Sequence, residues 1–176
     1  MNEVLSIPVG FLVCDTMLKA ADVTLVAASC VCAGKYYAAV TGEVAAVRSS
    51  VEAGKAAAGG ALVDCLVIPN VDVQVAPAIM ACSDIKDIGA VGIMETFSLC
   101  AAVTAADTAA KTAEVKLLEV RLGRGLGGKS FVLLSGEVAA VEAAVRAAEA
   151  LEQTRGLMTK SVVIPSPHPD LLRALF

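Results

Sequence analysis

The sequence has few aromatic residues and no long apolar segment. Tryptophan is absent, and aromatic residues make up only 3% of the 176 residues. Hydrophobic residues nevertheless account for 57% of the chain, and the mean hydropathy is +0.74. A membrane-spanning helix needs roughly 20 consecutive apolar residues, and charged residues or clustered glycines interrupt every apolar run here. The apolar residues are mainly Ala and Val, which bury little area each, so we expect a thin core and further burial against other subunits.

The sequence also lacks an excess of basic residues and an export signal. Fourteen Lys and Arg against eighteen Asp and Glu give a net charge of −4. This argues against nucleic-acid binding, because phosphate contacts need clustered cations. The first residues do not combine a basic region with a long apolar stretch, so we expect a cytosolic protein. Its six cysteines are then expected to be thiols rather than disulfides: Cys14, Cys30, Cys32, Cys65, Cys82 and Cys100.

Residue sets typical of catalysis are missing. His168 is the single histidine and lies between two prolines, which favours a surface role over a nucleophile–histidine pair. The glycine-rich segment 123–129 lacks the Gly-Lys-Ser/Thr spacing that opens a helix in phosphate-binding loops, and a strand is expected to follow it. We therefore do not expect an enzyme. Acidic residues that recur at equivalent positions are expected to cap and pack helices: Asp15 and Asp107, Glu43 and Glu137.

An internal repeat organises the chain. The segment Thr41–Val47 (TGEVAAV) recurs as Ser135–Val141 (SGEVAAV). Upstream, Asp15–Val23 matches Asp107–Val115, and downstream Val67-Ile68-Pro69 recurs as Val163-Ile164-Pro165. Such a repeat indicates a duplicated domain. We expect one domain over residues 1–82 and a second over 83–176, joined at the polar stretch Cys82–Asp87.

Each copy is expected to fold in the order βαββαβ, which gives an α+β, ferredoxin-like domain with helices on an antiparallel sheet. The first helix of each copy is indicated by apolar residues that recur at helical spacing: Phe11, Cys14 and Leu18 in copy one, and Val103, Ala106 and Ala110 in copy two. Thr41 and Ser135 are candidate caps for the later helices. The expected strands are Glu3–Leu5, Val23–Ala28, Tyr36–Val40 and Leu62–Ile68, then Ala90–Thr96, Val115–Val120, Ser130–Leu134 and Thr159–Ile164; the expected first helices are Pro8–Ala20 and Leu99–Thr112.

Cys30-Val31-Cys32 precedes Gly34 in the expected loop between two strands. Thiolates are the ligands that iron–sulfur clusters prefer. A Cys-x-Cys pair lacks the four ligands of a typical zinc or ferredoxin motif, however, and free cysteines also pack as small apolar side chains. The spacing by itself therefore favours packing and leaves metal binding as the alternative.

The chain resembles the tandem-domain shell proteins of bacterial microcompartments (BMC). The second copy carries the resemblance most clearly, through Ala90–Thr96, Ala105-Ala106-Asp107 with Lys111, Gly127-Gly128-Lys129, Ser135–Val138 and Ile164–His168. The resemblance covers nearly all of both halves. It implies a homotrimer of two-domain chains that forms a pseudohexameric tile beside other shell proteins, in a microcompartment shell within the cytoplasm.

The first copy resembles the propanediol-utilisation type T subgroup of that family, through Cys32-Ala33-Gly34-Lys35-Tyr36, Gly42-Glu43 and Leu62-Val63-Asp64. That resemblance implies one [4Fe–4S] cluster per trimer at the three-fold pore, held by three Cys32 thiolates and a non-protein ligand on the fourth iron. The cluster would serve electron transfer or cluster delivery across the shell, with a redox enzyme or carrier as the partner. Cys30 is extra and is expected to be a packing residue.

The resemblance also assigns the pore lining and the shell edge. The pore-lining positions are Cys30, Ala33, Gly34, Lys35, Gly125, Leu126, Gly127 and Gly128, and the shell-edge positions are Lys19, Lys111 and His168. The family's edge arginine is replaced by Asn70 in the first copy and Ser166 in the second, so other groups must supply its hydrogen bonds. Two alternatives remain: a cluster-free tile whose pore passes small metabolites, and an enzyme or regulator built on duplicated ferredoxin-like domains.

Overall fold

The computed structural model describes residues 1–84 and 87–175 and divides into two compact units. The first unit contains Met1–Val71, with Ser98–Cys100 and Leu122–Lys129 joined to it by contacts; the second contains Asp72–Phe97, Ala101–Arg121 and Ser130–Phe176. Ile85 and Lys86, in the stretch expected to join the two copies, lie outside the described residues, and the domain boundary stays a prediction.

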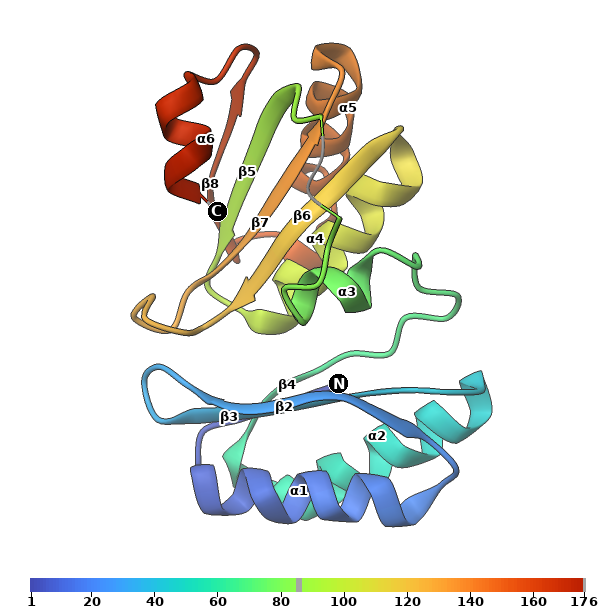
Figure 1. Ribbon diagram of the computed structural model, residues 1–176. Coiled ribbons are helices and arrows are strands. Elements are labelled where there is room, and N and C mark those ends of the chain that lie inside the picture. Colours follow the sequence, from blue (N-terminus) through green and yellow to red (C-terminus); the bar gives the residue numbers. More distant parts are fainter. Residues whose placement is uncertain (85–86, 176) are drawn as a thin grey trace. The chain divides into compact units, whose positions relative to one another are not determined.

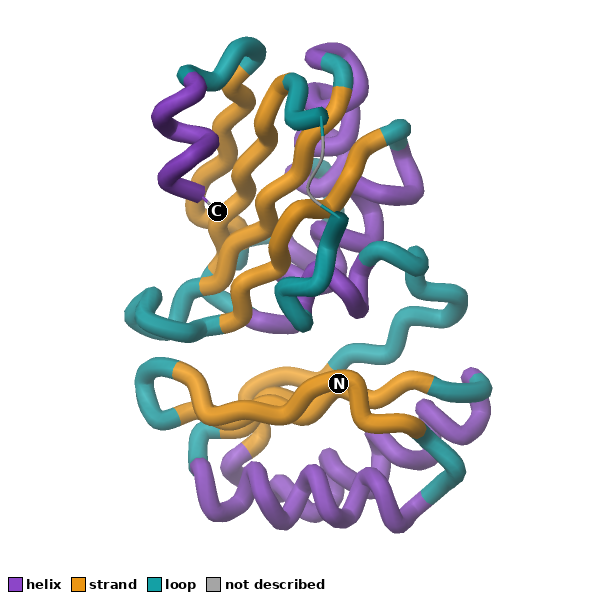
Figure 2. Tube along the Cα trace, in the orientation of Figure 1, coloured by secondary structure: helices purple, strands orange, loops and turns teal. Residues whose placement is uncertain are grey.

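The first copy forms a four-stranded antiparallel sheet in the order β2-β3-β1-β4 (Figure 1). Both of its helices cover one face of that sheet, as the tube in Figure 2 shows. The middle strand β1 is short, as the sequence predicted. The elements are β1 (Asn2–Val4), α1 (Ile7–Ala20), β2 (Thr24–Val31), β3 (Lys35–Thr41), α2 (Val44–Ala58), the 3₁₀ turn η1 (Gly59–Ala61) and β4 (Leu62–Cys65).

The second copy repeats this topology in the order β6-β7-β5-β8. The duplicated ferredoxin-like fold expected from the repeat is therefore confirmed. A short helix, α3, precedes the copy and another, α6, follows it. The elements are α3 (Val75–Ile79), β5 (Ala90–Thr96), α4 (Leu99–Thr112), β6 (Val115–Leu122), β7 (Ser130–Gly136), α5 (Val138–Glu149), η2 (Glu152–Thr154), β8 (Met158–Ile164) and α6 (Pro169–Leu175).

The helix caps differ from the prediction. Thr41 ends β3, where it pairs with Thr24, and Ser135 lies within β7 opposite Val91. Because the strands run on through these residues, the N-cap positions fall on Glu43 and Glu137, neither of which makes a side-chain capping bond. The Ser135 hydroxyl instead accepts a hydrogen bond from the Gly89 N–H at 3.0 Å.

In α4, Val103 and Ala106 of the predicted apolar stripe are buried, but the stripe noted in copy one does not mark the buried side of α1. Cys14 is buried, but Phe11 is 61% exposed and Leu18 is 38% exposed. The buried side is made by Gly10, Val13, Cys14 and Met17. Gly10 decides this orientation, because a Cβ there would lie 2.3 Å from the Cβ of Tyr36. Glycine thus brings the helix backbone directly onto the side chain of β3.

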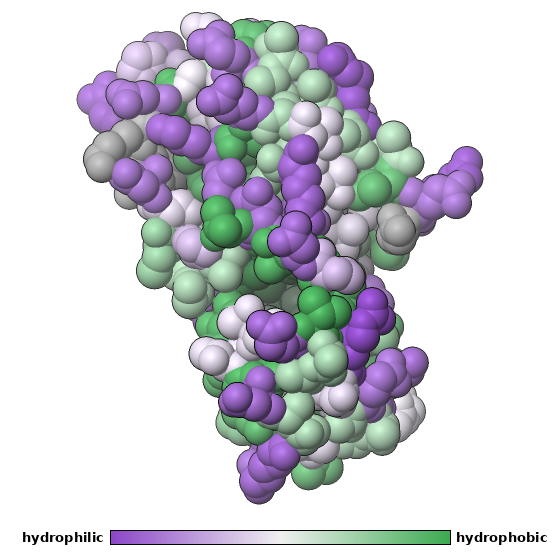
Figure 3. Space-filling model, turned by 90° about the vertical axis from the view of Figure 1, so that its right-hand side faces the viewer, coloured by the Kyte–Doolittle hydropathy of each residue, from purple (hydrophilic) through white to green (hydrophobic). Residues whose placement is uncertain are grey.

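Large apolar side chains remain on the surface of both units. They include Leu5, Phe11, Leu12, Val73 and Phe97, each more than half exposed. Figure 3 shows hydrophobic and hydrophilic residues interspersed on the face in view. The buried core contains many Ala and Val residues, as the composition predicted. Among the described residues, no helix is long and apolar enough to cross a membrane.

Candidate functional site

Cys32 lies in a tight turn between two paired strands. β2 ends at Val31, which pairs with Lys35 at the start of β3, so residues 32–34 form the turn. Gly34 has φ +76° and takes the left-handed conformation that the turn requires. A turn held on both sides by a strand ladder gives the cysteine a defined position.

The sulfur of Cys32 accepts a hydrogen bond from a second loop. The Gly125 N–H lies 3.2 Å from the Cys32 Sγ, and the Cys32 N–H donates to the Gly123 carbonyl at 2.9 Å. Both glycines belong to the β6–β7 loop, in the segment that contacts assign to the first unit. Gly123 has φ +67°, and a Cβ there would lie 2.8 Å from the Cβ of Val31. The two loops that the resemblance assigned to the pore therefore meet at Cys32.

One chain supplies a single thiol at this position. Cys32 is half-buried. Cys30 was expected to lie in the loop and to pack, but β2 continues to Val31, so Cys30 lies in the strand opposite Tyr36 and is exposed. Neither cysteine belongs to a cluster of three possible metal ligands within residues 1–84 and 87–175. A partly accessible thiol with a backbone donor at its sulfur fits an iron–sulfur ligand, since such hydrogen bonds tune these clusters. The remaining ligands would have to come from other copies.

Lys35 points away from the turn and toward the strands. Its Nζ lies 2.7 Å from Glu3 Oε1, and the two side chains are 16% and 0% exposed. The second Glu3 oxygen accepts the Leu99 N–H at 3.1 Å. Glu3 thus places its negative charge at the positive N-terminal end of α4 and beside a lysine. The pore-lining role predicted for Lys35 stays a prediction, but in a single chain this lysine anchors the turn.

The other predicted pore residues lie on the same two loops. Ala33 and Gly34 are exposed in the β2–β3 turn, and Leu126 and Gly127 follow Gly125 in the β6–β7 loop. Gly128 is buried, and a Cβ there would lie 3.7 Å from the Cys32 carbonyl oxygen.

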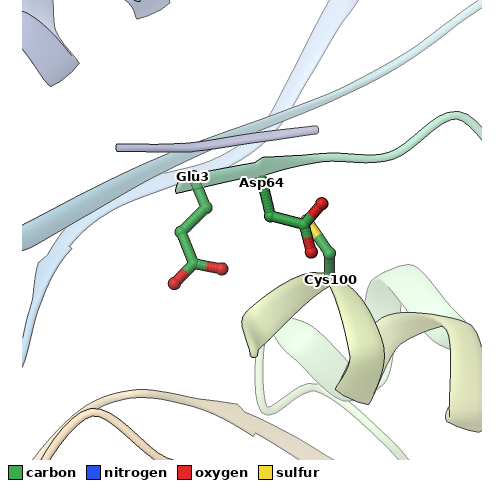
Figure 4. Close-up of side chains that lie close together, drawn as sticks. All are labelled: Glu3, Asp64 and Cys100. Carbon is green, nitrogen blue, oxygen red and sulfur yellow. The ribbon is translucent and has the colours of Figure 1, made fainter. Parts of the chain in front are cut away.

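A second cluster, not foreseen from the sequence, brings together Glu3, Asp64 and Cys100, whose ligand atoms lie within 4.8 Å of one another (Figure 4). Both carboxylates have donors: Asp64 accepts from the Ser98 hydroxyl at 2.9 Å and from the Cys65 N–H at 2.8 Å. Burial raises the pKa of the Cys100 thiol well above its ordinary value, with further contributions from Asp64 and Glu3. The thiol therefore stays protonated, and the cluster serves as a polar support for the strands. The acidic residue Glu3 within the short strand β1 was its one sequence signal.

The predicted edge lysines make the same local ion pair in both copies. Lys19 lies 2.7 Å from Asp15 on α1, and Lys111 lies 2.7 Å from Asp107 on α4. The first pair is exposed, with 74% of the lysine and 56% of the aspartate side chain accessible, whereas Asp107 is only 9% accessible. His168 is exposed at the start of α6. The shell-edge role of these residues stays a prediction.

Comparisons with known proteins agree with this architecture. The BMC domain family model matches residues 1–71 and again 90–167. The chain is 38% identical to the bacterial microcompartment shell protein PduT of Citrobacter freundii, over 98% of this chain and 94% of that protein.

Solved structures give the same result. A microcompartment protein from Desulfitobacterium hafniense superposes with a TM-score of 0.92 at 51% identity, over 98% of this chain and 96% of that one. A fused permuted hexameric shell protein of the RMM microcompartment gives a TM-score of 0.61 at 28% identity, over 83% of this chain and 76% of that one. With two BMC domains in tandem, the chain belongs to the family of bacterial microcompartment shell proteins.

Proposed function

We propose that three copies of this shell protein form a pseudohexameric tile whose central pore holds a [4Fe–4S] cluster on three Cys32 thiolates. The fourth iron would carry a non-protein ligand. Bound there, the cluster would supply one-electron transfer across the shell, to or from a redox enzyme or carrier, or would itself be delivered across the shell. The chain itself would turn over no substrate. The likeness to PduT and to tandem shell proteins supports the tile.

The observation that carries the proposal is the setting of Cys32. Its turn is fixed by the β2–β3 ladder, and its sulfur accepts the Gly125 N–H. The chain contributes one ligand at this point, so a cluster there requires several copies related by symmetry. The thin core and the exposed apolar side chains are what a chain that packs against copies of itself would have.

The test is purification of the full chain without oxygen, followed by measurement of iron, sulfide, the visible absorption spectrum and the EPR signal after reduction. We expect equal amounts of iron and sulfide and a brown protein. Cys32→Ser should lose the iron. Cys30→Ser is the matched control and should keep it, and circular dichroism should show both variants folded. Undiminished iron in Cys32→Ser would refute the assignment of the ligand.

The second candidate is a cluster-free tile whose pore passes small metabolites. It is favoured by the open space around the loop glycines: Cβ atoms added at Gly34, Gly125 and Gly127 would each meet nothing within 4 Å. A colourless oxygen-free preparation that contains no iron would support this candidate over the first.

A further inference from the structure

The segment that follows β4 docks on the edge of the second copy. The Asp72 N–H donates to Asp107 Oδ1 at 2.8 Å. The Gln74 side chain accepts from the Leu117 N–H at 3.0 Å and donates to the Val115 carbonyl at 3.2 Å. β6 is the outer strand of its sheet, so the Gln74 amide occupies the place that a further strand would take. All of these residues belong to the second unit.

The segment that follows β8 repeats the local structure of this docking turn. Aligning Pro69 with Pro165 matches Asp72 with His168 and Gln74 with Asp170. The Asp72 carboxylate accepts the Gln74 N–H at 2.9 Å, and the His168 Nδ1 accepts the Asp170 N–H at 3.1 Å.

The next backbone hydrogen bond is also shared. The Val75 N–H donates to the Asp72 carbonyl at 3.1 Å, as the Leu171 N–H donates to the His168 carbonyl at 3.0 Å. A helix then follows each turn, α3 after the first and α6 after the second. The turn after β8 therefore already has the conformation in which the turn after β4 docks.

The residues that dock in α3 have exposed counterparts in α6. Val75 and Ala78 are buried, at 3% and 0% exposure. The matching residues, Leu171 and Ala174, are both exposed. Leu172 packs against its own sheet, but helical geometry places it on another side of α6 from Leu171. The exposed side of α6 is thus available to a partner.

The first copy offers the matching acceptor. Asp15 and Lys19 on α1 correspond to Asp107 and Lys111 on α4, and β2 is the outer strand that corresponds to β6. The Asp15 carboxylate accepts from Lys19 on its own helix, and its side chain is 56% exposed. Leu25, the counterpart of the buried Leu117, is 41% exposed.

We propose that the turn His168–Leu171 of one copy docks on Asp15 and the outer edge of β2 of a second copy, repeating the docking of Asp72–Val75 within the chain. The inference rests on the proposed tile. In each contact the backbone N–H of His168 would donate to the Asp15 carboxylate, as the backbone N–H of Asp72 donates to Asp107. The Asp170 carboxylate can accept a hydrogen bond from the edge of β2 but cannot donate one. This contact therefore has one hydrogen bond fewer than the docking of Asp72–Val75 on β6, where Gln74 both accepts and donates. Donor and acceptor lie on different surfaces, and such a head-to-tail contact can close into a ring.

The test is site-directed cross-linking of the cluster-free full chain with a short bismaleimide. The background carries Cys30→Ser and Cys82→Ser, which remove the two exposed thiols, and Cys32→Ser, which removes the half-buried thiol that the tile would bring together at its pore. We expect Asp15→Cys combined with His168→Cys to give covalent dimers and trimers on denaturing gels. Each single variant should remain monomeric under these conditions. So should the control pair Glu52→Cys with His168→Cys, because Glu52 is exposed on a different helix, α2.

A second measurement uses single variants of the chain that keep all native cysteines. Asp15→Ala should weaken self-association about tenfold in analytical ultracentrifugation, which corresponds to losing one hydrogen bond to a charged group. Glu52→Ala should leave self-association unchanged.

The outcomes separate this inference from the proposed tile. Cross-links only within a chain, or none in a protein that sediments as a trimer, would overturn this inference and leave the tile intact. A chain that stays monomeric at all concentrations would overturn both. Cross-linked trimers, together with a chain that retains its native cysteines and never binds iron, would contradict the cluster and leave the docking contact intact.

Discussion

The buried ion pair between Lys35 and Glu3 should be a main support of the first copy. Lys35→Met keeps most of the side-chain volume but leaves the Glu3 carboxylate, which has no exposed surface, without its cation. Removing one partner of a buried pair costs about 3–5 kcal/mol. The Leu99 N–H still donates to Glu3, so we expect about 3 kcal/mol, the lower end of that range. Glu3→Gln should cost about 1–2 kcal/mol, because its amide oxygen can still accept from Leu99 while Lys35 is partly exposed.

The assay is urea unfolding of the wild type, both single variants and the double variant. With an m-value of about 2 kcal/mol/M, the loss of about 3 kcal/mol lowers the midpoint by about 1.5 M. The double variant Glu3→Gln/Lys35→Met should be more stable than Lys35→Met, since neither charge is then left unpaired. A Lys35→Met midpoint within about 0.2 M of wild type would refute the reasoning, and so would strictly additive losses.

Three further predictions concern the thiols and the close contacts. Burial raises the pKa of the Cys100 thiol, so the unfolded chain loses this proton before the folded chain does as pH rises, and the free energy of unfolding should fall above about pH 9. The urea midpoints at about pH 8 and about pH 10 should therefore differ less in Cys100→Ala than in the wild type. Gly10→Ala forces a Cβ against Tyr36 and should cost at least about 2 kcal/mol in thermal unfolding, whereas Gly60→Ala, with open space, should change stability by less than about 0.5 kcal/mol. Gln74→Ala should cost about 1–2 kcal/mol through its two lost bonds to the edge of β6, and Gln74→Glu about half as much because it can still accept one; equal stability of all three proteins would contradict this account.

Much of the fold followed from the duplication. Two copies of one pattern give two independent indications of each strand and helix, and for this reason the element order and sheet class were predicted correctly. The side of α1 that faces the core was not. Spacing marks several apolar stripes on so hydrophobic a helix, and the choice among them depends on Gly10 approaching Tyr36, a contact between residues on different elements.

The candidate site, like the fold, could be predicted from the sequence only in part. Cys32 and the glycine loops could be selected from the sequence through the family resemblance, because the motif is local. The N–H that Gly125 directs at the sulfur could not, since it joins loops far apart in the chain. The role of Glu3 was also hidden: an acid in a strand gives no sign of the lysine and helix end that it will meet.

By itself the sequence determined the repeat and the order of strands and helices, because periodicity and motif spacing record local geometry, whereas Cys32 was selected only through the family resemblance. The tertiary structure decided which face of each helix is buried, which charges are paired and which edges remain open. The Asp15–Lys19 and Asp107–Lys111 motifs show this most clearly. They have the same spacing and the same ion pair, yet one is exposed and the other is covered by Asp72. Burial depends on what the rest of the chain places against a motif, and a local pattern does not contain that information.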